Sequence, residues 1–252
     1  MIEFWHYPLL FVTALVAGFV DSIAGGGGLI TIPVLMSLGL PPREVLGTNK
    51  LQASFGSGSA SWHYARAGTV RLGDCTLGFL VSCVSAAVGA WLVRQLDPGF
   101  LRRFIPILLG LVAVYTILKP RLGEMESHAR LPRRAFDILF GVVIGFYDGF
   151  FGPGTGTFWT MAYMLGLGFS MARATGYTKV MNFASNISSL ALFLIGGNVL
   201  FGAGLVMGAG QWLGARLGAR MVIARGTKFI RPVFLTVVLA LTGKLLWYAY
   251  RS

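Results

Sequence analysis

The segment GFVDSIAGGG at residues 18–27 has a near-copy, GFYDGFFGPG, at residues 145–154. Each copy lies inside an apolar stretch and carries one acid followed by a cluster of glycines. A carboxylate near the centre of a membrane costs about 2.5–3.5 kcal/mol on insertion scales, so an acid retained there is a candidate for function. Asp21 and Asp148 are therefore predicted to act in coupling or gating, with capping of a broken helix as the alternative.

The similarity between the two halves continues along the chain. GTNK at 47–50 corresponds to GYTK at 176–179, SAAVGA at 85–90 to GQWLGA at 210–215, and residues 102–106 to residues 228–232. The offsets are 127 (145 minus 18), 129 (176 minus 47), 125 (210 minus 85) and 126 (228 minus 102), so order and spacing are kept. A duplication on this scale is typical of secondary transporters built from two repeats.

Composition places the chain in a bilayer. Of its 252 residues, 55% are hydrophobic and 12% charged, which is too much apolar surface for one soluble core. The net charge of +12 is scattered among loops, as expected for loops kept on the cytoplasmic side and not for nucleic-acid binding. The start of the chain lacks a basic region and a cleavage site, so its first apolar stretch is expected to be retained.

Chemistry-bearing clusters are missing from the sequence. Its two cysteines and three histidines have no metal-ligand spacing, and we find no nucleophile–base pair, P-loop or dinucleotide fingerprint. The sequence therefore predicts no metal, no cofactor and no enzymatic activity.

About eight hydrophobic segments are predicted, and the first of each half is interrupted by glycines. The interruption leaves pieces of about 13 and 12 residues, each too short for a span of about 20 residues. Such a segment is either a helix broken in mid-membrane or a re-entrant hairpin. We expect an all-α polytopic membrane protein in which residues 1–119 and 135–252 form two repeats and residues 120–134 form a cytoplasmic linker.

Loop charges favour the re-entrant alternative. If both interrupted segments span, the loops carry 12 Lys and Arg on one side against 8 on the other. If both are re-entrant and the N-terminus lies outside, the count is 14 against 6, leaving out Lys244 within the last apolar stretch. Each repeat then has three spans, an odd number, so the second repeat is predicted to be inverted relative to the first.

The glycine clusters are predicted to surround an anion. Glycine lets the backbone unwind and approach a ligand closely, and helices beginning at Leu29 and Thr157 would direct free N–H groups at it. Lys50 and Lys179, expected at the starts of the following helices, would add positive charge, with interfacial snorkelling as the alternative. The predicted substrate-binding residues are Gly25, Gly26, Gly27, Gly28, Asn49, Lys50, Gln52, Gly154, Thr155, Gly156, Thr178, Lys179, Asn182 and Asn186.

Small residues recur four apart late in each half. They are Ser85 and Gly89 in the first half, and Gly210, Gly214 and Gly218 in the second. This pattern indicates close helix packing, either within one protomer or in a homodimer.

With the duplicated acids and glycines in view, the chain resembles the sulfite exporter TauE/SafE family, also called the 4-toluene sulfonate uptake permease family. The motifs that carry the resemblance are Gly47-Thr48-Asn49-Lys50, Gly89-Ala90 and residues 174–179, and the similarity covers essentially the whole chain. It implies a multi-pass carrier of the bacterial inner membrane for small sulfur-containing anions such as sulfite, thiosulfate or organosulfonates. It leaves open the direction of transport and coupling to protons or sodium.

Two alternatives stay open on the sequence alone. One is an anion channel, and the other is a carrier for a small organic anion without sulfur. The second copy of the lysine motif has Tyr177 and Thr178 where the first has Thr48 and Asn49, so the two lysines need not contribute equally.

Overall fold

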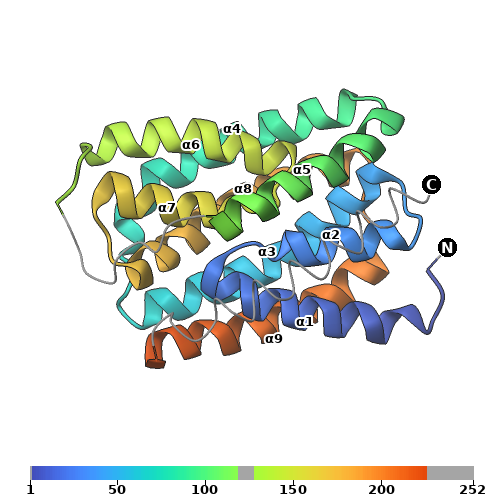
Figure 1. The fold of residues 1–252 in the computed structure, drawn as a ribbon, viewed down its shortest axis with the longest axis horizontal. Helices are drawn as coiled ribbons and strands as arrows, with labels where there is room; N and C mark the ends of the chain where they lie inside the picture. The colour runs from blue at the N-terminus through green and yellow to red at the C-terminus, as the bar shows by residue number, and fades with distance from the viewer. Residues whose placement is uncertain (1, 119–127, 226–252) are drawn as a thin grey trace.

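The computed structural model describes residues 2–118 and 128–225, and all its regular elements are helices (Figure 1). They are α1 (His6–Ala24), α2 (Gly28–Ser37), α3 (Pro42–Arg66), the short 3-10 helix η1 (Leu72–Cys75), α4 (Thr76–Gln95), α5 (Pro98–Leu118), α6 (Arg133–Phe150), α7 (Thr155–Leu167), α8 (Met171–Ile195) and α9 (Phe201–Arg225). Most of the predicted linker 120–134 and all of the apolar stretch 229–250 lie outside the described residues.

The bundle exposes many large apolar side chains and, beside an apolar core, buries several polar and charged ones. Large apolar residues such as Val84 on α4 and Val143 on α6 are more than half exposed, whereas Lys50 and Lys179 are buried. Within the described ranges, three helices are long and apolar enough to cross a membrane: His6–Ile23, Leu72–Gln95 and Met171–Ile195. A water-soluble bundle would have the opposite distribution, so the fold supports a membrane protein.

Each interrupted segment folds back as a hairpin. The N–H of Gly27 donates to Asp21 Oδ1 at 3.0 Å, and a Cβ built on Gly27 would lie 3.2 Å from the Ala17 carbonyl oxygen. In the second half, the Tyr147 hydroxyl donates to the Pro153 carbonyl at 2.8 Å, and its ring packs against Phe158 with centroids 5.3 Å apart. The second helix of each pair therefore turns back along the first.

The first helix of each hairpin is longer than predicted. The expected pieces were about 13 and 12 residues long, but α1 has 19 residues and α6 has 18, whereas α2 and α7 have 10 and 13. The predicted piece in the second half was 135–147, whereas α6 begins two residues earlier, at Arg133, and continues three residues further, through Asp148 to Phe150. A count of apolar residues leaves out the arginines and the acid at these ends.

The two halves exchange their packing partners. Helix α1 packs along α9, and α4 packs along α6, while α3 and α8 cross between them. In Figure 1, α1 starts at the end of the bundle that carries the N label, and α6 starts at the opposite end. The first helix of each half therefore packs against a helix of the other half.

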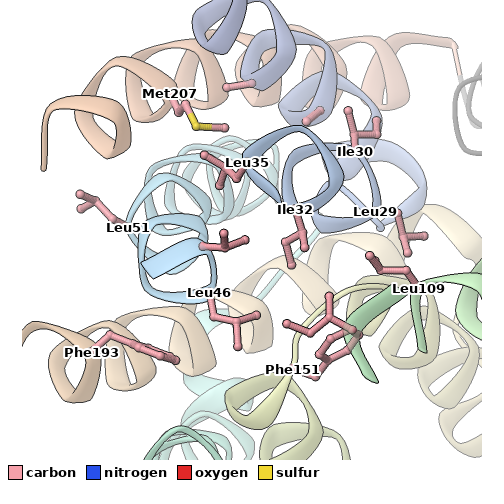
Figure 2. Packing of buried hydrophobic residues seen from close by; sticks show 14 of the residues in the cluster. Leu29, Ile30, Ile32, Leu35, Leu46, Leu51, Leu109, Phe151, Phe193 and Met207 are labelled. Carbon is pink, nitrogen blue, oxygen red and sulfur yellow. The ribbon is translucent and has the colours of Figure 1, made fainter. Parts of the chain in front are cut away.

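The short helix α2 is held inside the bundle. Figure 2 shows its side chains Leu29, Ile32 and Leu35 surrounded by apolar groups of other helices, among them Leu109 of α5 and Met207 of α9. Such enclosure fixes the position of the glycine loop that precedes α2, because the helix cannot shift without opening cavities in the core.

Small residues make the contacts between exchanged helices, as their spacing predicted, and they do so within the protomer. A Cβ on Gly214 of α9 would lie 2.0 Å from the Leu15 carbonyl oxygen of α1. In the other half, a Cβ on Gly89 of α4 would lie 2.3 Å from the Phe146 carbonyl oxygen of α6. These helices touch backbone to backbone, which only glycine permits.

Substitution of one such glycine should therefore separate two helices. Gly149→Ala would place a Cβ 1.9 Å from the Ala86 carbonyl oxygen, so we expect the melting temperature in detergent to fall by several degrees. Gly110→Ala in α5 is the matched control, since it meets nothing within 4 Å and alanine favours a helix by about 0.5–1 kcal/mol. Equal melting temperatures for the two variants would contradict this packing.

Candidate functional site

The two hairpin turns depend on glycine conformations. Gly25 and Gly26 have φ of 77° and 96°, and Gly152 and Gly154 have φ of 98° and 80°. Residues with a Cβ rarely adopt positive φ, so the turns need glycine at these four places. The turns follow α1 and α6 and precede α2 and α7. Helix α2 begins at Gly28 and α7 at Thr155, close to the predicted starts at Leu29 and Thr157.

Both turns meet at the centre of the bundle. A Cβ on Gly25 would lie 2.5 Å from the carbonyl carbon of Gly156, and a Cβ on Gly28 would lie 3.4 Å from Pro153 Cα. Two stretches of unwound backbone, one from each half, therefore lie against each other. Backbone of this kind is tolerated at membrane depth only where protein buries it or where it lines a cavity.

Lys50 and Lys179 occupy equivalent positions in α3 and α8. Each is the ninth residue of its helix (50 minus 42 plus 1, and 179 minus 171 plus 1). The sequence placed them at helix starts, which is wrong, because the polar first turns of both helices gave no apolar signal. Their relative exposures are 1% and 0%, so the alternative of lysines snorkelling to the membrane surface is also wrong.

Each lysine is paired with the acid of the other half. Lys50 Nζ lies 2.7 Å from Asp148 Oδ1 and also donates to the Asp148 carbonyl oxygen and, at 3.3 Å, to Asn186 Oδ1. Lys179 Nζ lies 2.9 Å from Asp21 Oδ2. All four residues were predicted from the sequence to be functional, but the contacts between them were not predicted. The two ion pairs join α3 to α6 and α8 to α1, so they link the halves of the chain reciprocally.

The two pairs differ in their surroundings. The side chains of Lys50 and Asp148 are 2% and 4% exposed, whereas the side chain of Asp21 is 20% exposed and also accepts from Gly27 N–H. Asp21 therefore caps the hairpin turn, which was the alternative role for the acids, and also forms an ion pair with Lys179.

A cavity of about 40 Å3 lies between the turns and the ion pairs. Since one water occupies about 10–15 Å3 on this scale, the cavity has room for a few waters or one small ion. Of the predicted substrate-binding and coupling residues, all line it except Gly25, Thr178 and Lys179. Gly25 packs on Gly156, Thr178 contacts Thr160, and Lys179 reaches Asp21 at the wall.

Three further residues line the cavity: Ala53, Gly152 and Gln211. Gln211, on α9, is 2% exposed, and Cβ atoms on Gly18 and Gly56 would lie 2.7 Å and 2.4 Å from its Oε1. Two glycines thus make room for this amide. Its counterpart in the first half is Ala86 (211 minus 125), so Gln211 breaks the symmetry of the site. An amide within an apolar stretch was the signal that could have found it.

Polar contacts fix the shape of the cavity wall. Thr31 Oγ1 lies 2.7 Å from Asn49 Oδ1, and Gln52 Nε2 donates to the same oxygen at 2.7 Å. The second half has the simpler contact between Thr160 and Thr178, at 3.2 Å. The two lysine motifs, which differ as Asn49 against Thr178, therefore make different hydrogen bonds in the cavity wall.

Several buried oxygens of the lining residues have no hydrogen-bond donor among the described residues. They are Gln52 Oε1, Asp148 Oδ2 and Asn182 Oδ1. A buried acceptor without a donor costs about 1–3 kcal/mol. Polar atoms left in this condition around a cavity indicate an occupant, water or ligand, that supplies the missing partners.

Comparisons with known proteins give membrane transporters. The sequence model of the family described as Sulfite exporter TauE/SafE matches residues 10–245. The chain is 46% identical to the probable membrane transporter protein ORF9 of Sinorhizobium sp, over 97% of this chain and 94% of that protein. It is 44% identical to the probable membrane transporter protein YfcA of Escherichia coli K12, over 95% and 89%. No solved structure matches the chain.

Proposed function

The chain belongs to the sulfite exporter TauE/SafE family of membrane transporters, and on this premise we propose that it is a secondary transporter for small sulfur-containing anions. Sulfite, thiosulfate and organosulfonates are the candidate substrates. The transporter works by alternating access and lies as a multi-pass protein in the bacterial inner membrane, consistent with its bacterial relatives.

The cavity between the hairpin turns carries this proposal. The N-termini of α2 and α7 lie in its wall at Gly28 and Thr155, and both bring the positive ends of their helix dipoles to it. Lys50 lines the cavity directly, and Lys179 contacts Asp21, which lines it. Half-helix ends around a central site are typical of carriers for anionic substrates.

Inverted repeats would explain how the site opens alternately to the two sides. Two features support this proposal: α1 and α6 start from opposite ends of the bundle, and each half docks its first helix on the other half. With the re-entrant hairpins, about eight hydrophobic segments cross or enter the membrane. Rocking of one half against the other would then expose the cavity first to one side and then to the other.

Topology is testable with single cysteines. Glu124→Cys and Arg225→Cys, each in a background without Cys75 and Cys83, should both be shielded from an impermeant thiol reagent added outside intact cells. The reason is that the 14-to-6 charge count places both loops in the cytoplasm. Labelling of only one of the two positions would overturn the inverted arrangement.

Substrate is testable in proteoliposomes. The purified protein should catalyse uptake and counterflow of at least one labelled anion from a panel of sulfite, thiosulfate, sulfate, sulfoacetate and taurine. A channel would instead give ionic currents in an electrical recording without counterflow, because it has no alternating step. Counterflow only of anions without sulfur would support the alternative substrate class.

Gln211 should contribute to substrate affinity. Gln211→Ala removes an amide from the cavity wall, and Gly56→Ala should displace the same amide, because the new Cβ would lie 2.4 Å from its Oε1. A neutral hydrogen bond contributes about 0.5–1.5 kcal/mol, so KM should rise about 2- to 12-fold in both. Gly58→Ala, which meets the ring of Phe183 instead, is the control. An unchanged KM in both variants would remove Gln211 from the site.

A further inference from the structure

Both lysines at the site are already paired with carboxylates, and Lys50, which lines the cavity, has no donor left for an anion. All three protons of the Lys50 ammonium are directed to acceptors: Asp148 Oδ1, the Asp148 carbonyl and Asn186 Oδ1. Lys179 is held by Asp21. Each lysine charge is cancelled by the acid of the other half, so the two pairs together have no net charge.

An anion entering this site would meet the buried carboxylate of Asp148 and the partly buried carboxylate of Asp21, each already paired with a lysine. The oxygens left without donors, Gln52 Oε1, Asp148 Oδ2 and Asn182 Oδ1, are acceptors as well. An anion alone brings more acceptors and one uncompensated negative charge into a buried site, which is strongly unfavourable. A proton corrects both deficits, since it adds a donor and restores neutrality.

We propose that the anion binds together with protons, one for each of its negative charges, and that it replaces a protonated carboxylate as the partner of the lysine. This deepens the proposed function and rests on it. In the first step, a proton forms an O–H bond with the carboxylate of Asp148 or Asp21. The lysine ammonium then exchanges that neutral acid for the anion. Charge balances, since Lys⁺ and Asp⁻ with H⁺ and A⁻ become Lys⁺ with A⁻ and neutral AspH.

The number of ion pairs limits how many protons can bind with each anion. A monovalent anion needs one pair to open and one proton, and a divalent anion needs both pairs and two protons. Transport is therefore electroneutral symport of anion and proton. The reciprocal pairing also joins this event to opening of the site, because each ion pair that breaks removes a link between the two halves.

Few other ionisable groups face the carboxylates. Asp148 faces Lys50 from α3, Asp21 from α1 and its neighbour Tyr147. Asp21 faces Lys179 from α8 and Tyr64 from α3, whose hydroxyl donates to the Ser22 carbonyl. In the described ranges, α4, α7 and α9 contribute no ion pair to either acid. A proton that binds either carboxylate therefore competes with the lysine paired to it.

The test measures proton and anion fluxes together in proteoliposomes of the full-length protein. Methanesulfonate serves as the monovalent probe and thiosulfate as the divalent one, with an internal pH dye to count protons. We expect about one proton per methanesulfonate and about two per thiosulfate, with fluxes unaffected by a potassium diffusion potential of either sign. Anion flux without acidification, or flux that follows the potential, would overturn the inference and leave the proposed function intact. No flux of any anion in the full panel would overturn both.

Variants of the acids provide a second measurement. Asp148→Asn leaves Lys50 with a neutral partner, so anion flux should lose its proton and become sensitive to the membrane potential, and Asp21→Asn should act likewise through Lys179. Asp97→Asn is the control, because this exposed acid only caps the start of α5, a role that asparagine also fills. If both site variants keep the wild-type proton count, the carboxylates do not carry the proton. The stoichiometry of the wild-type protein decides the question should a variant fail to fold.

Discussion

Lys50→Met and Lys179→Met should each lower the initial rate of anion transport by about 10- to 100-fold, since a hydrogen bond to a charged group contributes about 1.5–3 kcal/mol. Lys50→Met should also destabilise the protein by about 3–5 kcal/mol, because Asp148 would remain buried without its counter-charge. The effect on stability should be smaller for Lys179→Met, whose partner Asp21 is partly exposed and also bonded to Gly27 N–H.

A double variant separates folding from transport. In Lys50→Met/Asp148→Asn no buried charge is left unpaired, so the melting temperature in detergent should recover while transport stays low. Arg103→Met is the control, because Arg103 is exposed on α5, away from the cavity. Wild-type rates in both single lysine variants would show that these residues only hold the halves together.

Gly25→Ala should abolish transport and lower the melting temperature. Gly25 has φ 77° and ψ 168°, a conformation essentially confined to glycine, and a Cβ there would lie 2.5 Å from Gly156 C and 2.6 Å from Thr157 N. Both atoms are backbone of the opposite hairpin, so neither can yield without moving the start of α7.

Gly39→Ala is the matched control for Gly25→Ala. Gly39 has φ 72°, but a Cβ there meets nothing within 4 Å, so the substitution should cost only the strain of about 1–2 kcal/mol for a left-handed residue. Similar transport and melting temperatures for the two variants would show that the contact between hairpin turns is not needed.

Local features of the fold were predictable from the sequence. The duplicated acids and glycines located both hairpin turns, and the small residues around Gly89 and Gly214 predicted the close helix contacts. These predictions succeed because each depends on a short segment, in which an acid, a glycine cluster or a small-residue spacing has few explanations inside a membrane.

Long-range features were not predictable in the same way. Lys50 and Asp148 are 98 residues apart, and Lys179 and Asp21 are 158 apart, so their pairing depends on how the halves dock. The helix starts of α3 and α8 were missed for a related reason. Their first turns carry charged residues, Arg43 and Glu44 in α3 and Arg173 in α8, so hydropathy does not reveal them.

Protection of a cysteine in the cavity by substrate tests the central claim most directly. Ala53 lines the cavity, and Ala53→Cys in a background without Cys75 and Cys83 places one small thiol there. The alkylation rate of this thiol, in a variant shown to transport, should fall in a saturable manner when the transported anion is added, with half-protection near its KM. Alkylation that is unchanged by a saturating, transported anion would contradict the account, because the substrate would then pass elsewhere.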